Sequence, residues 1–196
     1  MNLNICGYAL IALLLYVCMK IYQDSDMFNL KCIISGVDGK KYCVRERHKL
    51  ELAADRLATV NQSMSKLVEH CFKVYPDREN IKRLKIGYNP KKIMETLPTS
   101  EYTAYSENKG EKIAFCLNTE KEGDQLIDPN TLTFVAIHEL SHIATKSIGH
   151  KDEFWSNFKF LLGEASKIGI YEQIDYKKKP KRYCGTDIND NPYFDL

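Results

Sequence analysis

Hydrophobic positions divide the chain into one continuous apolar run at the start and a longer part with periodic patterns. Residues 5–19 (ICGYALIALLLYVCM) carry no charged side chain and are nearly all apolar. From Leu3 to Tyr22 the run has 20 residues, which at about 1.5 Å per helical residue matches the thickness of a bilayer core. Apolar side chains occupy every face, which disfavours a buried amphipathic helix. The pattern predicts a transmembrane helix over residues 1–22 and a polar linker over residues 23–30.

Two other kinds of N-terminal segment share some of these features. A cleaved signal peptide has a basic start and a small-residue cleavage site, whereas this chain begins MNLN and has Val17, Cys18 and Met19 at the end of the run. A lipoprotein signal has a small residue before its cysteine, and here Val17 precedes Cys18. All nearby lysines follow the run, so a single-pass protein would have its C-terminal domain in the cytosol, at a host or virion membrane. The seven cysteines are then expected to be mostly reduced thiols.

The pattern after the linker predicts a hairpin and a long helix. Residues 31–44 (KCIISGVDGKKYCV) alternate on either side of Asp38-Gly39, a pair suited to a two-residue turn that would place Ile34 opposite Cys43. In that register Cys32 and Cys43 are diagonal, so a disulfide between them is possible but not implied. Residues 46–75 have apolar side chains three and four positions apart, which is typical of one buried helix face.

The second half of the chain mixes short strands and helices. A helical turn and two strands are predicted over residues 91–96, 102–106 and 111–117. Asp128 and Pro129 suit a helix N-cap and first turn, and they predict a helix from there to about residue 147. Residues 152–167 predict a second helix with one apolar face. The tail, residues 171–196, is predicted to be irregular.

Composition narrows the class of protein. Gly and Pro together make 10 + 6 = 16 of the 196 residues, too few for collagen-like or low-complexity chains. A net charge of +2 gives no general electrostatic case for binding nucleic acid. Hydrophobic residues make up 44% of the chain, and no repeat of solenoid length is visible. Residues 31–196 are therefore expected to form one globular domain.

The predicted helix from Pro129 carries the chemistry. It contains HELSH, residues 138–142, in which His138 and His142 are one turn apart and can reach a single cation. Glu139 follows the first histidine and can act on water at a metal without being a ligand itself. The four residues before it are apolar, so the helix is expected to be buried. The plain alternative is a solvated helix face with two accidental histidines.

A third histidine follows this helix closely. Gly149 ends the helix, and a turn there can bring His150 back toward the other two histidines. Three neutral nitrogen ligands with an open fourth position are typical of catalytic zinc rather than structural zinc. The sequence therefore predicts one Zn²⁺ per chain, bound by His138, His142 and His150, with Glu139 as a general base that acts on metal-bound water.

Residues 138–155, HELSHIATKSIGHKDEFW, resemble the WLM/SprT-like branch of zinc metallopeptidases. In that branch HExxH precedes a Gly-His or His-Gly pair and then a helix with Phe or Trp. The chain is most similar to the WLM-type metallopeptidases of large DNA viruses, through segments that span most of residues 31–188: VDGKKYCVRE, AYSENKGEKIAFCL, GHKDEFWSNFKFLLGEASKIGIY and YCG. The resemblance implies the same three zinc ligands and the same base, Glu139.

The resemblance also implies a fold. We expect an α+β, zincin-like domain in which a small antiparallel sheet packs on the HExxH helix. Residues 111–118 would form the edge strand above that helix, and an extended protein or peptide substrate would add to this edge by main-chain hydrogen bonds. The predicted membrane contact through residues 3–22 departs from the cellular DNA-repair members and argues against a chromatin role.

Two groups in the tail are further candidates. Tyr176 and Tyr183 are either oxyanion-stabilising residues or ordinary packing tyrosines. A basic cluster is a solvated tail, a contact with anionic lipid, or a nucleic-acid site; it comprises Lys177, Lys178, Lys179, Lys181 and Arg182. The leading interpretation is a membrane-anchored zinc metallopeptidase. The alternatives are a DNA-associated protease acting on protein–DNA crosslinks, and a non-catalytic virion or membrane structural protein that keeps the metal site.

Overall fold

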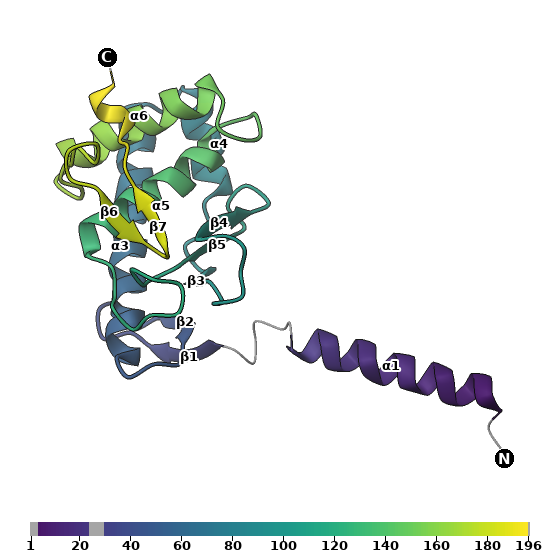
Figure 1. The fold of residues 1–196 in the computed structure, drawn as a ribbon. Helices are drawn as coiled ribbons and strands as arrows, with labels where there is room; N and C mark the ends of the chain where they lie inside the picture. Colours follow the sequence, from purple (N-terminus) through teal and green to yellow (C-terminus); the bar gives the residue numbers. More distant parts are fainter. Residues whose placement is uncertain (1–3, 24–29, 196) are drawn as a thin grey trace.

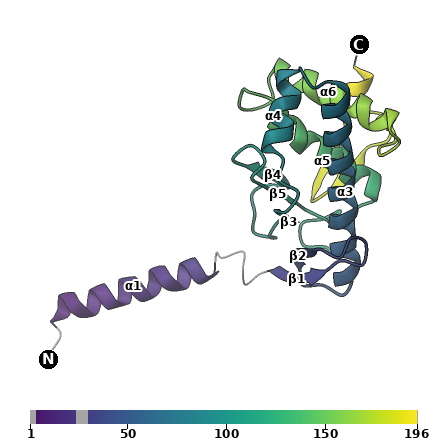
Figure 2. The same cartoon turned by 180° about the vertical axis from the view of Figure 1, so that it is seen from behind.

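The computed structural model describes residues 4–23 and 30–195. Helix α1 (Ile5–Gln23) lies apart from the other elements in both views (Figures 1 and 2), and its large apolar side chains are exposed. The predicted transmembrane helix is wrong, because no helix among the described residues is both long and apolar enough to cross a membrane. The uninterrupted apolar part, residues 5–19, is 15 residues long and extends roughly 22 Å, which is short of a bilayer core of about 30 Å.

Two other expectations depended on that helix and are corrected: the localisation and the redox state of the cysteines. Single-pass membrane localisation with a cytosolic domain required a spanning helix and is wrong for the same reason. Membrane contact through residues 3–22 stays a prediction, because contact with a membrane surface does not require a spanning helix. The cysteines are not mostly reduced: two disulfides join Cys32 to Cys43 and Cys116 to Cys184. Of the predicted linker, residues 24–29 lie outside the described residues, and its two ends belong to α1 and to the first strand.

Five strands form one mixed sheet in the order β1-β2-β3-β5-β4. The strands are β1 (Leu30–Ile34), β2 (Lys41–Arg45), β3 (Ile93–Glu95), β4 (Ala104–Glu107) and β5 (Lys112–Phe115). The outer pairs, β1 with β2 and β4 with β5, are antiparallel, whereas β3 runs parallel to both of its neighbours. The fold is α+β as expected, but the expected antiparallel sheet is wrong at its centre. Two helices between β2 and β3 return the chain to the same end of the sheet, which makes a parallel pair possible.

The β1–β2 hairpin has a different register from the predicted one. Cys32 lies directly opposite Cys43, and Ile34 lies opposite Lys41. The connecting loop is longer than two residues: the Ser35 N–H donates to the Lys40 carbonyl at 2.9 Å. Gly39 has φ +66°, a left-handed conformation that glycine adopts without steric cost. The longer loop shifts the pairing by two residues, and this shift brings the two cysteines together.

Four helices pack with the sheet around one core. They are α3 (Leu50–Val74), α4 (Glu79–Gly87), α5 (Pro129–Ala144) and α6 (Asp152–Lys167). Helix α3 contacts β1, β2 and β3, and α5 contacts α3, α4, α6 and β4. Figure 1 shows α5 in the middle of this arrangement. The predicted helices over residues 46–75 and 152–167 are confirmed, and their predicted apolar faces are buried. The helix that carries HELSH is therefore the central one.

Several short elements that pair with residues distant in the sequence differ from the predicted secondary structure. The predicted helical turn at residues 91–96 is strand β3, and Glu95 in it is buried, with ion pairs to Arg45 and Arg47. Helix α4 was not predicted. The tail is not wholly irregular, because it contains a hairpin of β6 (Lys181–Tyr183) and β7 (Thr186–Ile188), followed by a 3-10 turn, η1 (Pro192–Phe194).

Candidate metal centre

Helix α5 begins with a cap and buries almost all of its side chains. The Asp128 carboxylate accepts a hydrogen bond from the Thr131 N–H at 2.9 Å, and Pro129 occupies the first turn, where its missing N–H costs nothing. Every residue from Thr131 to Ala144 is buried except His138 and His142. The cap and the buried helix confirm the prediction, although the helix ends at Ala144 rather than at residue 147. Within residues 131–144 the two least buried positions are therefore these two histidines, which line a cleft.

Three histidine rings converge at this cleft. The Nε2 atom of His138 is 3.2 Å from Nε2 of His142 and 3.1 Å from Nε2 of His150. Ligand atoms of all three lie within 4.8 Å of one another. Nitrogen ligands of a tetrahedral zinc ion, each at about 2.0–2.1 Å from it, are about 3.3–3.4 Å apart. The spacing and chemistry of these three nitrogens therefore fit a zinc ion, and the three histidines expected to be ligands do lie together.

Burial keeps the two helical histidines uncharged. Burial, together with smaller contributions from the neighbouring His142 and His150, lowers the pKa of His138 to about 3. Burial likewise lowers the pKa of His142 to about 4, with contributions from His150 and Lys109. Histidine binds a metal through a neutral ring nitrogen. These two side chains are therefore in the metal-binding form at neutral and mildly acidic pH.

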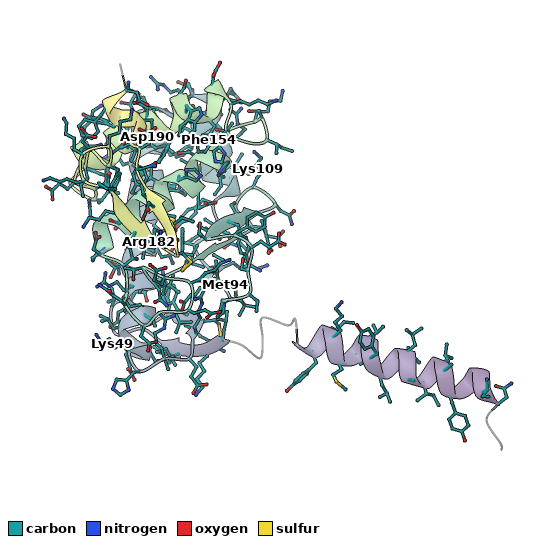
Figure 3. All side chains as sticks on the ribbon, viewed as in Figure 1. Lys49, Met94, Lys109, Phe154, Arg182 and Asp190 are labelled. Carbon is teal, nitrogen blue, oxygen red and sulfur yellow. A yellow bond between two sulfur atoms is a disulfide. The ribbon has the colours of Figure 1, made fainter. Side chains whose placement is uncertain are left out.

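One aromatic ring packs against all three histidines. Phe154, in the first turn of α6, is fully buried, and Figure 3 labels it. Its ring centroid is 4.9 Å from that of His138, 4.4 Å from that of His142 and 4.6 Å from that of His150. The apolar face predicted over residues 152–167 includes Phe154, but its contact with the histidines was not predicted from the sequence. The available signal was its position, four residues after the third histidine, at the start of the next helix.

Glu139 lies in the same cleft without a protein partner. Its side chain is buried, with 4% of the residue exposed, and it makes no hydrogen bond or ion pair with any residue that the structure describes. Burial raises the pKa of this carboxyl to about 8. A buried carboxyl that lacks a hydrogen-bond partner is costly in its charged form. Glu139 is therefore suited to taking up a proton beside the three histidines.

The cleft has a volume of about 1220 Å³ and is lined by residues from four parts of the chain, among them Gly149 and His150 of the loop after α5. Helix α5 forms its floor, and strand β4 with residues 97–103 forms one wall. Tyr183, Thr186 and Ile188 of the C-terminal hairpin form the other wall. The predicted edge strand, residues 111–118, is wrong. It contains β5, which lies between β3 and β4, because the chain forms the outermost strand first and then turns inward.

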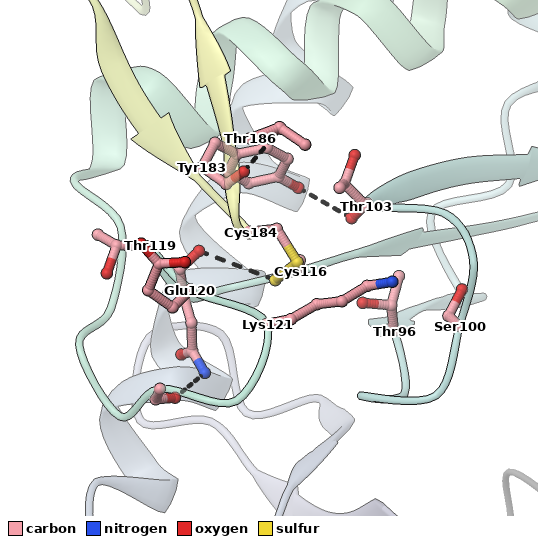
Figure 4. Close-up of a disulfide and its surroundings, with 12 residues drawn as sticks. Thr96, Ser100, Thr103, Cys116, Thr119, Glu120, Lys121, Tyr183, Cys184 and Thr186 are labelled. Atoms are coloured by element: carbon pink, nitrogen blue, oxygen red, sulfur yellow. Dashed lines mark hydrogen bonds between the residues drawn. A yellow bond between two sulfur atoms is a disulfide. The ribbon is translucent and has the colours of Figure 1, made fainter.

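A disulfide attaches the C-terminal hairpin to the sheet (Figure 4). Cys184, at the turn between β6 and β7, is bonded to Cys116, which directly follows β5. Both residues are buried. The Cys184 N–H donates to the Asn118 carbonyl at 3.0 Å, and the Gly185 N–H donates to the Thr119 carbonyl at 2.9 Å. The hairpin that walls the cleft is thus fixed by one covalent bond and by backbone hydrogen bonds.

Of the two tyrosines that were candidates for oxyanion stabilisation, only one lines the cleft. Tyr183 does so, and its hydroxyl donates to the Thr103 carbonyl at 3.1 Å. Burial raises its pKa, and the charge of nearby Glu139 adds to this. Tyr176 is buried in the core, where its ring packs edge-to-face on Phe134 at 4.8 Å between centroids. The structure therefore places Tyr183, but not Tyr176, in the lining of the cleft that holds the three histidines.

The basic cluster of the tail is largely neutralised by nearby carboxylates. Four of its five members lie within salt-bridge distance of an acidic residue: Lys177 with Asp190 and Asp195, Lys178 with Asp175, Lys181 with Asp128, and Arg182 with Glu120 and Asp187. None of the five, Lys179 included, lines the metal-site cleft. Most of the charge that suggested lipid or nucleic acid is therefore balanced locally.

Three viral proteins are similar to this chain. It is 30% identical over 194 residues to the uncharacterized protein R325 of Acanthamoeba polyphaga mimivirus, a match that covers 93% of this chain and 92% of that protein. It is 35% identical over 98 residues to the uncharacterized protein 136R of Invertebrate iridescent virus 6, and 34% identical over 99 residues to the uncharacterized protein 042R of Invertebrate iridescent virus 3. Those two matches cover about half of this chain and 53% and 55% of the relatives. No family model matches the chain, and no solved structure matches it.

Proposed function

This chain belongs to the family of viral proteins that includes the mimivirus protein R325, and we propose that it is a zinc-dependent metallopeptidase. The observation that carries the proposal is the convergence of three histidine nitrogens, 3.1 and 3.2 Å apart, in a cleft that also holds a buried, unpartnered carboxyl. The HELSH and Gly-His residues resemble those of WLM/SprT-like metallopeptidases, and this resemblance supports the same assignment.

His138, His142 and His150 would bind the zinc ion. When bound, zinc polarises a substrate carbonyl and lowers the pKa of water from about 16 toward about 7. Glu139 accepts the proton of the attacking water and then delivers it to the leaving amine. In the metal-free chain burial raises the pKa of this carboxyl to about 8, and the charge of a bound zinc ion would favour the ionised form, which accepts a proton.

Strand β4 offers a place for an extended peptide. The Thr103 carbonyl accepts a hydrogen bond from the Cys116 N–H at 2.8 Å, and Tyr105 pairs with Ala114. In an antiparallel pair, alternate residues direct their backbone groups to the partner strand and the others direct them away. The backbone groups of Ala104 and Ser106 therefore face away from β5, at the wall of the cleft. A substrate strand would bind there by main-chain hydrogen bonds.

Metal content and cleavage by the full-length chain test the proposal. We expect about one zinc per chain by mass spectrometry and loss of zinc in His142→Ala. We also expect cleavage of a quenched-fluorescent peptide library, and a fall in kcat/KM of about 10²–10⁴-fold in Glu139→Gln, with zinc retained. A folded protein without stoichiometric zinc, or equal cleavage by Glu139→Gln, would refute the peptidase. Zinc without cleavage would leave a non-catalytic metal site.

A further inference from the structure

The third histidine, His150, lies on a loop and not on helix α5, so other contacts must hold it in place. Residues 145–151 join α5 to α6, and this loop includes Gly149 with φ +80°. His150 is exposed, yet its Nε2 atom lies 3.1 Å from that of His138. Exposed loops are ordinarily the more mobile parts of a protein. Something must therefore hold the backbone of this loop on the metal side.

One support is Lys109, which reaches the loop from the turn between β4 and β5. Its Nζ donates to three backbone carbonyls, those of His142 at 3.1 Å, Thr145 at 2.8 Å and Ser147 at 3.0 Å. These are carbonyls at the end of α5 and in the loop, where helical partners run out. A single ammonium group thus joins the second histidine's turn to the backbone that leads to His150.

The turn that carries Lys109 is built to present it. Lys109 has φ +57°, a left-handed conformation that a residue with a Cβ rarely adopts. The next residue, Gly110, has φ +105°, and a Cβ there would be only 2.5 Å from the Gly87 carbonyl oxygen. The turn is therefore fixed against the end of α4. Unfavourable backbone conformations of this kind persist where the surrounding structure requires them.

The second support is Glu153, which binds the same loop through its N–H groups. One carboxylate oxygen accepts from the Lys146 N–H at 3.0 Å, and the other accepts from the N–H and the hydroxyl of Ser147 at 3.2 and 3.1 Å. Arg83 donates to this carboxylate at 3.2 Å. Trp155, two residues after Glu153, donates its indole N–H to the carbonyl of His150 itself at 3.0 Å.

We propose that Lys109 is a positioning residue for the third metal ligand, and that it acts together with Glu153 to hold the His150 loop from its carbonyl side and its N–H side. This inference rests on the proposed metal site, because it concerns a ligand of that site. The simpler alternative is that Lys109 only caps α5, as basic groups at helix C-termini commonly do. The two roles predict different results when Lys109 is replaced: loss of a positioning residue weakens zinc binding, whereas loss of a helix cap alone leaves zinc affinity unchanged.

The test measures zinc dissociation constants of the full-length chain by competition with a chromophoric chelator. Lys109→Met removes the ammonium group but keeps the length of the side chain, and we expect it to weaken zinc binding by about 10–100-fold, as loss of a group that orients a ligand does. Lys109→Arg keeps the charge and the donors and should recover most of this loss. Glu153→Gln should weaken binding in the same direction. Lys92→Met is the matched control, because Lys92 forms an exposed pair with Glu111 near the same turn, and it should change affinity less than twofold.

A His150→Ala background shows whether Lys109 acts through the third ligand. In that background we expect Lys109→Met to change zinc affinity less than twofold, because the ligand that it positions is gone. An equal loss in both backgrounds would overturn the proposal and point to the helix and its two histidines. Unchanged zinc affinity together with a lower Tm of the zinc-free protein would show that Lys109 only caps α5, and would overturn the proposal. A wild-type chain that binds no zinc would overturn both this inference and the proposed function, whereas zinc binding without peptidase activity would overturn only the latter.

Discussion

Removing the Cys116–Cys184 disulfide should cost more stability than removing Cys32–Cys43. A disulfide stabilises a protein chiefly by restricting the unfolded chain, and the effect grows with the loop that it closes. The two bonds join cysteines 68 and 11 residues apart. With a loop entropy of about −2.1 − 1.5R ln n cal/mol/K, these loops correspond to about 4.4 and about 2.8 kcal/mol at 25 °C. The expected difference between the two bonds is therefore about 1.6 kcal/mol.

Urea unfolding of two double variants measures this difference. Cys116→Ala with Cys184→Ala removes the long-range bond, and Cys32→Ala with Cys43→Ala removes the hairpin bond. The same proteins are then unfolded in reductant, where the wild type also lacks both bonds. The difference in free energy of unfolding between wild type and variant in reductant is then subtracted from the same difference without reductant. This subtraction removes the cost of replacing the side chains themselves, which matters because Cys116 and Cys184 are buried. What remains is the contribution of each bond to the free energy of unfolding.

Equal contributions from the two bonds, or a larger one from the hairpin bond, would refute the loop-length reasoning. Residual structure in the unfolded chain would then dominate. Hydrogen exchange adds a second readout. Without Cys116–Cys184, the amides of β6 and β7 should lose protection locally while those of α5 keep theirs, because the bond anchors the hairpin and not the helix.

Three further predictions concern the zinc-free protein. Its free energy of unfolding should fall as the pH falls from about 6.5 toward 4, because the unfolded chain protonates histidines near pH 6.5 while the folded pKa values of His138 and His142 are about 3 and about 4. Urea unfolding at several pH values should show that the free energy of unfolding depends less on pH in the double variant His138→Asn with His142→Asn. An unchanged pH dependence would contradict this cause. Asp128→Ala should cost about 1 kcal/mol and Asp128→Asn only a few tenths, because asparagine also caps helices; equal losses in thermal melts would contradict the cap. Gly149→Ala should cost about 1–2 kcal/mol for its left-handed backbone. Gly110→Ala should cost more in the same unfolding assay, because its Cβ would also meet the Gly87 carbonyl at 2.5 Å, and a smaller loss than at Gly149 would be inconsistent with that contact.

The cluster of three histidines could be predicted because its geometry is local. The three histidines fall within residues 138–150, and the period of one helix followed by one glycine turn brings them to the same side. The cap at Asp128 and the apolar face of α6 are also local signals, and both are confirmed. Helix α3 could be predicted for the same reason, since its periodic apolar positions need no knowledge of the rest of the chain.

The features that sequence reasoning missed depend on distant partners. Residues 93–95 form a strand because β2 and β5 lie on either side of them and because Arg45 and Arg47 pair with Glu95. The sequence of residues 93–95 gives no indication of those partners. Lys109 likewise precedes the helix end that it supports by more than 30 residues, and its left-handed backbone has no sequence signal comparable to glycine. The order of β5 and β4 follows from tertiary packing and not from periodicity.

The C-terminal hairpin also determines when the cleft becomes complete. A chain is synthesised from its N-terminus, so residues 138–150 leave the ribosome before Cys184 does. The cleft therefore cannot be complete when the three histidines emerge. Only after Cys184 has emerged can β6 and β7 close their side of the cleft and Cys184 bond to Cys116. During synthesis, the wall formed by Tyr183, Thr186 and Ile188 is thus the last part of the cleft to become available.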